Sequence, residues 1–409
     1  MTMLGRVGVL RTRYYDPAGG SDVPVDKLVD DAGRMVTLGV TEVACRLATD
    51  STSFQRAAGN LLRAAGLSIS EESLRQLVEG EGRLLLTAQR NEQLELDFAA
   101  ADCRTTVTGE PTRVAVDGLF GEEPVGEPST ARALSVTRIY LGSDGVMVPA
   151  ITDAEKLKRR AKARELRANL PREQGRKRLP LPALKRGADG PYKEFKIVTF
   201  YDQDQSHRYV RATRGDCHAA GKLMRRGAGE LRVKAADERL VVADGAAWIW
   251  NQATANAPSM DVHVLDFYHL SEHIHAAKRA VFGEDDPPGK AWVEQALHTV
   301  KHEGYDPFWS NLIETRAGVR SPARRAALDE LMQYVAARKQ MIIYPRCLEM
   351  GWDIGSGSTE SMCNTLTRRL KLRGMRWDLD NAEAMMALET LEQCNGWDAW
   401  RKMRISSMN

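Results

Sequence analysis

The chain has 409 residues, of which 43% are hydrophobic and 28% charged, and its formal net charge at pH 7 is +3. This composition excludes an intrinsically disordered protein, and the near-neutral balance leaves local clusters of charge as the guide to a partner. The six cysteines lie far apart without a CxxC pair, which argues against a zinc ribbon or a disulfide scaffold. No apolar run approaches the ~18 residues of a membrane span, so we expect a cytoplasmic protein with no membrane partner.

Residues 1–95 are expected to form a helical DNA-binding region. Apolar residues at helical spacing predict one helix over 53–65 and a second over 70–84, with residues 66–69 as the turn between them. Two short helices joined by a tight turn are typical of a helix-turn-helix, here about 53–84, although a plain helical hairpin fits the same spacing. The Gly-, Pro- and Thr-rich residues 96–135 then predict a linker.

Strands dominate the next part of the chain. Residues 136–145 predict a strand that runs into a turn, and four more strands are expected over 194–201, 207–213, 239–243 and 262–266. A basic insertion at 151–190 holds thirteen Lys or Arg against five Asp or Glu and begins as a helix over 153–169. Another helix is expected over 218–230, and a long helical region follows at 269–345. This order predicts an α/β protein whose mixed sheet has antiparallel and parallel parts.

Three carboxylates stand where such a sheet could bring them together. Asp144 ends the first expected strand and Asp244 ends the fourth, and a glycine that lets the backbone turn away follows each. Glu360 comes after a Gly/Ser stretch that can cap a helix, so it is expected in a first helical turn. An Asp-Gly pair is also ordinary turn chemistry at a strand end.

Two groups of cations are candidates for binding nucleic acid. The first lies on the helix expected in the basic insertion and comprises Lys158, Arg159, Arg160 and Lys162. The second follows Glu360 and comprises Arg368, Arg369, Lys371, Arg373 and Arg376. A carboxylate followed by cations within one or two helical turns suits a phosphodiester held near a metal, but a solvated basic helix face has the same pattern.

The sequence of residues 139–395 resembles that of a DDE-type transposase of a bacterial insertion sequence, the ISKra type. The matching segments include IYLGSDGVMVP, VVADGAAWIWNQ, LDFYHLSEHIHAAKRAVFGE and GWDIGSGSTESMCN. The resemblance implies a ribonuclease-H-like mixed sheet with flanking helices, built from 136–268 and 346–409, with 269–345 as an all-helical insertion. It implies that Asp144, Asp244 and Glu360 are catalytic ligands of Mg²⁺, or of Mn²⁺ in its place. It also implies that Asp266 and His269, a D-x-x-H pair, support them.

The implied activity is metal-dependent cleavage and transfer of DNA strands at the ends of an insertion sequence. Its partners would be transposon ends and target DNA, bound by a homo-oligomer in a synaptic complex. Asp117, in Val-Ala-Val-Asp-Gly, competes with Asp144 as the first carboxylate, but the expected antiparallel strands follow Asp144.

Two alternatives stay open at this point. His269-Leu-Ser-Glu272-His273 spells H-x-x-E-H, a zinc metallopeptidase pattern in which two histidines bind Zn²⁺ and the glutamate acts as base. That pattern needs a further acidic ligand, which the sequence does not single out. The second alternative is a non-catalytic DNA-binding relic of a transposase, against which an intact acidic triad argues.

Overall fold

A mixed sheet forms the centre of the molecule. A computed structural model describes residues 1–3, 7–17, 20–23, 25, 36–107, 134–169, 180, 181 and 183–407. In this part of the chain the central sheet has six strands in the order β6-β5-β4-β7-β8, and the sixth, β3, also pairs with β4. The strands are β3 (Arg104–Val107), β4 (Leu134–Pro149), β5 (Tyr192–Tyr201), β6 (Arg208–Thr213), β7 (Glu238–Ala243) and β8 (Val262–Leu265). A separate pair joins β1 (Tyr14–Asp16) to β2 (Gly20–Asp22).

The pairing of these strands confirms the predicted α/β class. β4 and β5, and β5 and β6, run antiparallel, whereas β4 and β7, and β7 and β8, run parallel. The register of β4 against β7 is constant, from Arg138 opposite Glu238 to Leu141 opposite Val241. This register decides which residues meet where β7 ends.

The first strand continues beyond the turn that the sequence predicted at Asp144. β4 runs on to Pro149, paired with β5 throughout, and Val146 and Val148 are buried. Gly145 is not at a turn: a Cβ there would lie 2.1 Å from the Glu194 carboxylate on β5. The Glu194 side chain is long and flexible enough to move aside, so this contact does not by itself require glycine, and the strand extends because its residues pair with β5 throughout.

Helices cover both faces of the sheet. One hydrophobic cluster joins the sheet to α5 (Cys217–Glu230) and α6 (Ala247–Asn256), and a second joins it to α12 (Gly357–Thr367) and α13 (Leu379–Gln393). β5 contributes to both, since Phe195 and Ile197 belong to the second cluster and Val198 and Phe200 to the first. Short 3-10 turns η2 (Ala100–Asp102), η3 (Val233–Ala235) and η4 (Lys339–Met341) complete the connections.

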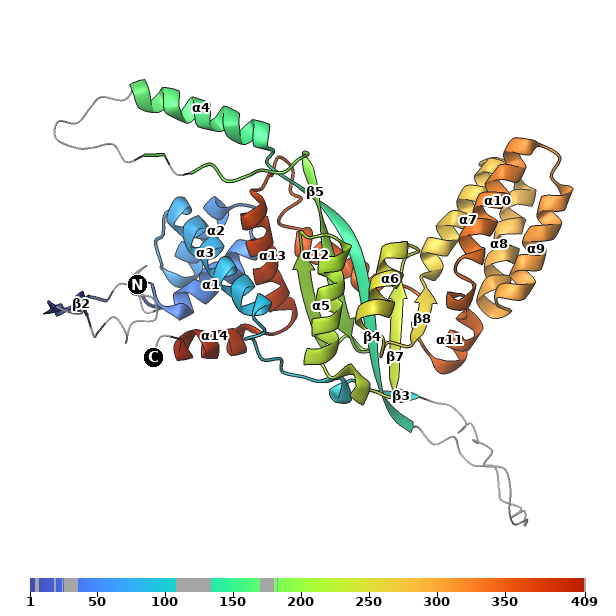
Figure 1. The fold of residues 1–409 in the computed structure, drawn as a ribbon, viewed down its shortest axis with the longest axis horizontal. Helices are drawn as coiled ribbons and strands as arrows, with labels where there is room; N and C mark the ends of the chain where they lie inside the picture. The colour runs from blue at the N-terminus through green and yellow to red at the C-terminus, as the bar shows by residue number, and fades with distance from the viewer. Residues whose placement is uncertain are drawn as a thin grey trace, which may run out of the picture.

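The N-terminal helices pack on the C-terminal ones. These are α1 (Leu38–Asp50), α2 (Phe54–Ala65) and α3 (Glu71–Arg90), beside α13 and α14 (Trp397–Ser406) (Figure 1). The helix pair predicted at 53–84 is confirmed, with Ser53 and Ser70 as N-caps and Gly66 ending α2 at φ 65°. α3 lies so close to α13 that a Cβ on Gly82 would be 2.4 Å from the carbonyl oxygen of Ala384.

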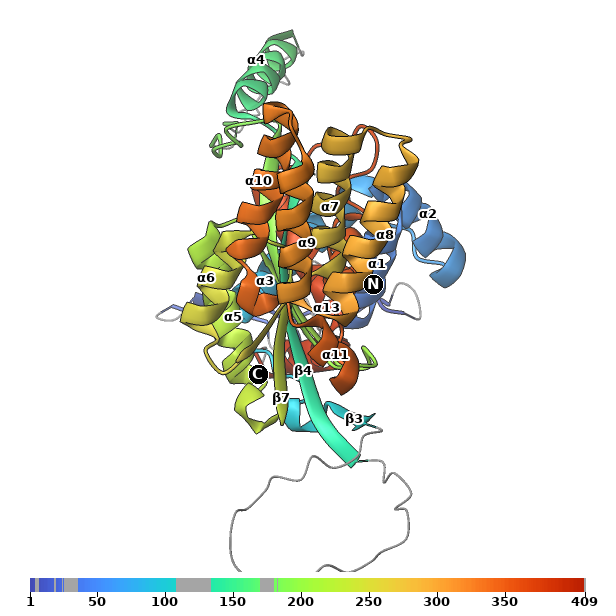
Figure 2. The same cartoon turned by 90° about the vertical axis from the view of Figure 1, so that its right-hand side faces the viewer.

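A group of five helices stands at the other end of the sheet. It comprises α7 (Phe267–Phe282), α8 (Pro287–His302), α9 (Tyr305–Gly318), α10 (Pro322–Ala336) and α11 (Tyr344–Met350), which confirms the helical region expected over 269–345. α7 to α10 lie side by side beyond β8, and α4 (Asp153–Asn169) projects away from the sheet (Figure 1, Figure 2). No helix in the described residues combines the length and apolar character needed to cross a bilayer.

The linker expected over 96–135 is ordered where it is described. Residues 96–107 hold η2 and β3, and β3 pairs with the start of β4 from Arg104 opposite Thr137 to Val107 opposite Leu134. The Arg-Thr-Thr-Val sequence of β3 is suited to a strand, but the Gly- and Pro-rich residues after it hid this strand propensity. Asp117, the competing first carboxylate, lies outside the described residues.

Candidate functional site

The strand register brings Asp144 and Asp244 to the same level of the sheet. The last pair of β4 with β7 is Leu141 with Val241, and Asp144 and Asp244 each come three residues after that pair on their own strands. Burial raises the pKa of Asp144, and the charge of Asp244 raises it further. Two carboxylates of like charge thus share one region, which is unfavourable unless a cation or a proton offsets the repulsion.

Glu360 reaches the same region from α12, in the first helical turn as predicted. The helix crosses β4 at Gly142, where a Cβ would lie only 1.8 Å from the Thr359 hydroxyl oxygen, and that hydroxyl is 3.1 Å from the Thr199 hydroxyl on β5. Cys363, one turn beyond Glu360, has its pKa raised first by burial and then by the charges of Asp144 and Glu360. The same thiol therefore lies close to both carboxylates.

Asp266 joins the elements that carry these groups. It is 1% exposed and caps α7, because its Oδ1 accepts a hydrogen bond from the backbone amide of His269 at 2.8 Å. Its Oδ2 accepts hydrogen bonds at 2.5 Å from both the amide and the hydroxyl of Ser356, and that hydroxyl is 3.2 Å from Glu360 Oε1. The D-x-x-H pair is thus a helix cap made through the backbone of His269 and not through its ring.

Tyr334 of α10 is a residue that sequence reasoning missed. Its ring stacks on His273 with centroids 3.8 Å apart, and its buried hydroxyl has no hydrogen-bond partner in the described residues. Burial, together with the charges of Asp244 and Asp266, raises the pKa of Tyr334 to about 12. A Cβ on Gly245 would lie 2.2 Å from this hydroxyl, so the second Asp-Gly also marks a close approach. A tyrosine on an ordinary helix gives no sequence signal of this position.

Spacing distinguishes this group from a closed metal centre. Within the described ranges, one set of three Cys, His, Asp or Glu side chains has its ligand atoms within 4.8 Å of one another, and it is Cys103, Asp202 and His207. The carboxylates of Asp144, Asp244 and Glu360 do not all lie within this distance of one another. The H-x-x-E-H residues do not meet this spacing either: His269 Nδ1 is 3.6 Å from Glu272 on α7, while His273 packs on Tyr334.

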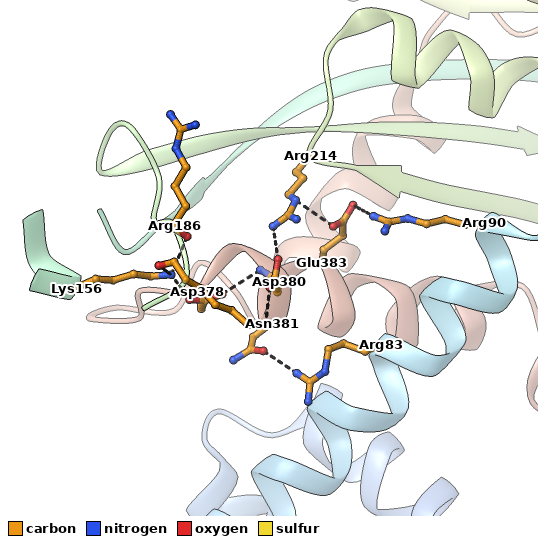
Figure 3. Close-up of polar contacts among 10 residues, drawn as sticks. Arg83, Arg90, Lys156, Arg186, Arg214, Asp378, Asp380, Asn381 and Glu383 are labelled. Atoms are coloured by element: carbon orange, nitrogen blue, oxygen red, sulfur yellow. Dashed lines mark hydrogen bonds and ion pairs between the residues drawn. The ribbon is translucent and has the colours of Figure 1, made fainter. Parts of the chain in front are cut away.

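The candidate DNA-binding cations are in different surroundings. On α4, Lys158, Arg159 and Lys162 are exposed and Arg160 is half-buried, and Arg159 pairs with Glu155 at 2.5 Å. The helix is held at its base, where Lys156 is buried and pairs with Asp378 (Figure 3). The remaining length projects from the protein, so its cations are accessible to a partner.

The cations after Glu360 do not share one helix face, contrary to expectation. α12 ends at Thr367, so they lie in the turns that follow it. Arg369 is 6% exposed, and its guanidinium lies 5.3 Å from the ring centroids of both Phe54 and Trp377, which excludes a direct contact with DNA in this structure. Arg376 is bound to the Ala150 carbonyl and to Glu155.

Of the same group, Arg368 pairs with Asp50 at 2.8 Å, and Lys371 and Arg373 are exposed. These two are therefore the members best placed for contact with a polyanion. The sequence could not separate them from Arg369, because one of the two aromatic residues beside that side chain, Phe54, comes from a distant segment of the chain.

The N-terminal helix pair is held to the body of the protein by its second helix. Arg90 of α3 pairs with Glu383, and Arg83 of α3 donates to Asn381, both on α13 (Figure 3). Arg75, near the start of α3, pairs with Glu72 and Glu79 of its own helix. One side of α3 is thus buried on α13, and only its other side can meet a partner.

Comparisons with known proteins yield little. No family model matches the sequence, and no curated protein matches it. Among solved structures, the strand transfer complex of the Drosophila P element transposase is similar over 88% of this chain and 79% of that chain, at 13% identity and a TM-score of 0.25. A TM-score this low establishes no shared fold.

Proposed function

We propose that this chain is a transposase that cleaves and joins DNA strands at the ends of an insertion sequence. The observation that carries the proposal is the register of β4 and β7, which sets Asp144 level with Asp244 while α12 brings Glu360 over β4. The strand order β6-β5-β4-β7-β8 supports it, because a ribonuclease-H-like core is expected to place the first and fourth strands of its sheet side by side.

The donor set of this site fits Mg²⁺ or Mn²⁺. All three groups are carboxylates, the hard oxygen ligands that these ions prefer, and the pKa of Asp144 is raised by burial and by the charge of Asp244, a repulsion that a cation would relieve. When bound, such an ion supplies activation of a water or a 3′-hydroxyl and stabilisation of the leaving oxygen in an in-line displacement. Asp144 and Asp244 would hold the ion, and Glu360 would complete the ligand set.

The surrounding residues position these ligands. Asp266 fixes the first turn of α12 through Ser356, and thereby the approach of Glu360 to β4. Arg338 of the insertion donates to the carbonyl of Gly245 at 3.2 Å and so holds the backbone next to Asp244. These contacts explain why a helical insertion would be retained beside the site: it supplies one wall of it.

DNA is the proposed partner. Terminal and target DNA would lie along the exposed cations of α4 and near Lys371 and Arg373, with contacts to phosphates that carry no sequence information. The outer side of α3 would read the ends. We propose that the chain acts as a homo-oligomer when it brings two ends together.

The test is cleavage and joining of DNA that carries the repeats flanking this gene. The variants Asp144→Asn, Asp244→Asn and Glu360→Gln should each abolish Mg²⁺-dependent cleavage while DNA binding survives. Each replaces a metal-binding carboxylate by an amide of nearly the same size and shape. Glu194→Gln is the matched control, since that carboxylate lies beside Gly145 but outside the proposed set. Cleavage at the normal rate by any of the three variants would contradict the proposal.

A further inference from the structure

A second group of metal-binding side chains lies away from the three carboxylates. Cys103 stands between η2 and β3, Asp202 directly follows β5, and His207 directly precedes β6. Their ligand atoms lie within 4.8 Å of one another, and His207 Nδ1 is 2.8 Å from Asp202 Oδ2. Two segments about a hundred residues apart thus bring together a thiol, a carboxylate and an imidazole.

This group is separate from the proposed catalytic site. Asp144 pairs with Ile197 on β5, and Asp202 comes five residues later along the same direction. At about 3.3 Å per residue of strand, the two aspartates are separated by roughly 17 Å. The inference therefore does not depend on the proposed function.

The surroundings of the cluster leave a role for a cation. Cys103 is fully buried and Asp202 is 3% exposed, and in the described residues Asp202 has no ion pair with a lysine or arginine. Its partners are Ser206 at 2.5 Å and the amide and ring of His207. The Cys103 thiol donates a hydrogen bond to the Ala99 carbonyl, with 3.8 Å between the sulfur and the oxygen. A buried carboxylate beside a buried thiol would gain from a shared positive charge.

We propose that Cys103, Asp202 and His207 form a binding site for Zn²⁺. A thiolate, an imidazole and a carboxylate are its usual ligands, and three protein ligands leave a fourth tetrahedral position for water. The ring of His207 is the exposed side of the cluster, with 33% of its side chain accessible, so water has a route to that position. The thiolate and the carboxylate together balance the charge of the ion, which keeps the buried site neutral.

Zinc at this position would join two parts of the fold that the chain connects only at a distance. It would fasten the segment before β3 to the β5–β6 turn, beside the tilted ring contact of Phe98 with His207, whose centroids are 5.0 Å apart. Because the unfolded chain does not hold these ligands together, binding would stabilise the folded state.

The test uses the full chain, stripped with a chelator and reloaded with Zn²⁺ or Co²⁺. We expect one equivalent of zinc, a higher Tm after loading, and a thiolate-to-metal charge-transfer band with Co²⁺. Cys103→Ser should abolish that band, and His207→Gln should lower zinc content. Cys217→Ser on α5 is the matched control and should change neither. The Co²⁺ band is read on the unaltered chain, so a variant that fails to fold does not decide the outcome.

Three results would overturn the inference. The first is an unaltered chain that binds far less than one equivalent of zinc and shows no Co²⁺ thiolate band. The second is a metal content that Cys103→Ser and His207→Gln leave unchanged. The third is a loss of zinc that follows His269→Gln or His273→Gln instead, because the metal would then sit at the H-x-x-E-H residues of α7.

Discussion

Replacing Gly142 by alanine should push α12 away from β4. The new Cβ would lie 1.8 Å from Thr359 Oγ1 and 3.0 Å from Thr359 Cβ, where ordinary van der Waals contact begins near 3.4 Å. Relief of the closer contact needs about 1.6 Å of movement in a region where Thr359 is 1% exposed. Overpacking of this kind costs about 1–3 kcal/mol of unfolding free energy.

The same substitution should also impair catalysis. Glu360 is the next residue after Thr359, and a misplacement of about 1 Å can lower an enzymatic rate by about 10²-fold. We therefore expect Gly142→Ala to unfold at lower urea concentration and to cleave terminal DNA about a hundred times more slowly than the wild type. Adding Thr359→Ala removes the closest atom and should restore part of both losses.

A control glycine makes the result interpretable. Gly229 lies in α5 with no atom within 4 Å of a built Cβ, so Gly229→Ala should leave cleavage intact and raise stability by up to about 1 kcal/mol. A Gly142→Ala protein with normal stability and rate would refute the close approach of α12. Losses that Thr359→Ala fails to relieve would place their cause elsewhere.

Three further substitutions test other contacts. Burial and then the charge of Asp244 raise the pKa of Asp144, so the folded state loses stability as pH rises from about 4 through that pKa. Without divalent metal, Asp144→Asn should therefore be more stable than the wild type near neutral pH. Urea titrations should show this difference in stability closing near pH 4. Tyr334→Phe removes a hydroxyl that has no partner in the described residues and should not lower Tm, whereas Tyr334→Ala also removes the ring stacked on His273 and should lower Tm. Arg369→Met should raise stability by about 1 kcal/mol and leave the salt dependence of DNA binding unchanged. Lys371→Met should instead lower, by about 0.9, the steepness with which the logarithm of the DNA-binding constant falls with the logarithm of the salt concentration. Equal slopes for the two variants would contradict the burial of Arg369.

Local signals predicted much of the fold. The caps Ser53 and Ser70 and the turn at Gly66 act within a few residues, so the helices they bound were predictable from the sequence. The same is true of the strand predicted over 194–201, which the structure has over 192–201, and of the first turn that holds Glu360. The catalytic roles of the three carboxylates remain predictions.

Features that depend on distant partners were not predictable. Asp144-Gly145 is a dipeptide typical of turns, and only its pairing with the neighbouring strand β5 shows why the backbone continues straight. Arg369 and Lys371 stand in the same basic stretch of sequence, but Arg369 is covered by Phe54, which lies more than three hundred residues earlier in the chain. The Cys103 cluster likewise needed the fold, because its members have no spacing that marks a metal site.

The packing of α1 to α3 on α13 has a consequence for synthesis in the cell. The apolar side of α3 is completed by α13, which begins roughly 290 residues after α3 ends, so at about 5–20 residues per second the ribosome takes about 15–60 seconds to supply it. During that time the N-terminal helices are made but cannot bury their shared surface. A nascent chain of this protein therefore exposes the apolar surface of α3 for most of its translation. We expect chaperones to bind this surface on the ribosome until α13 emerges.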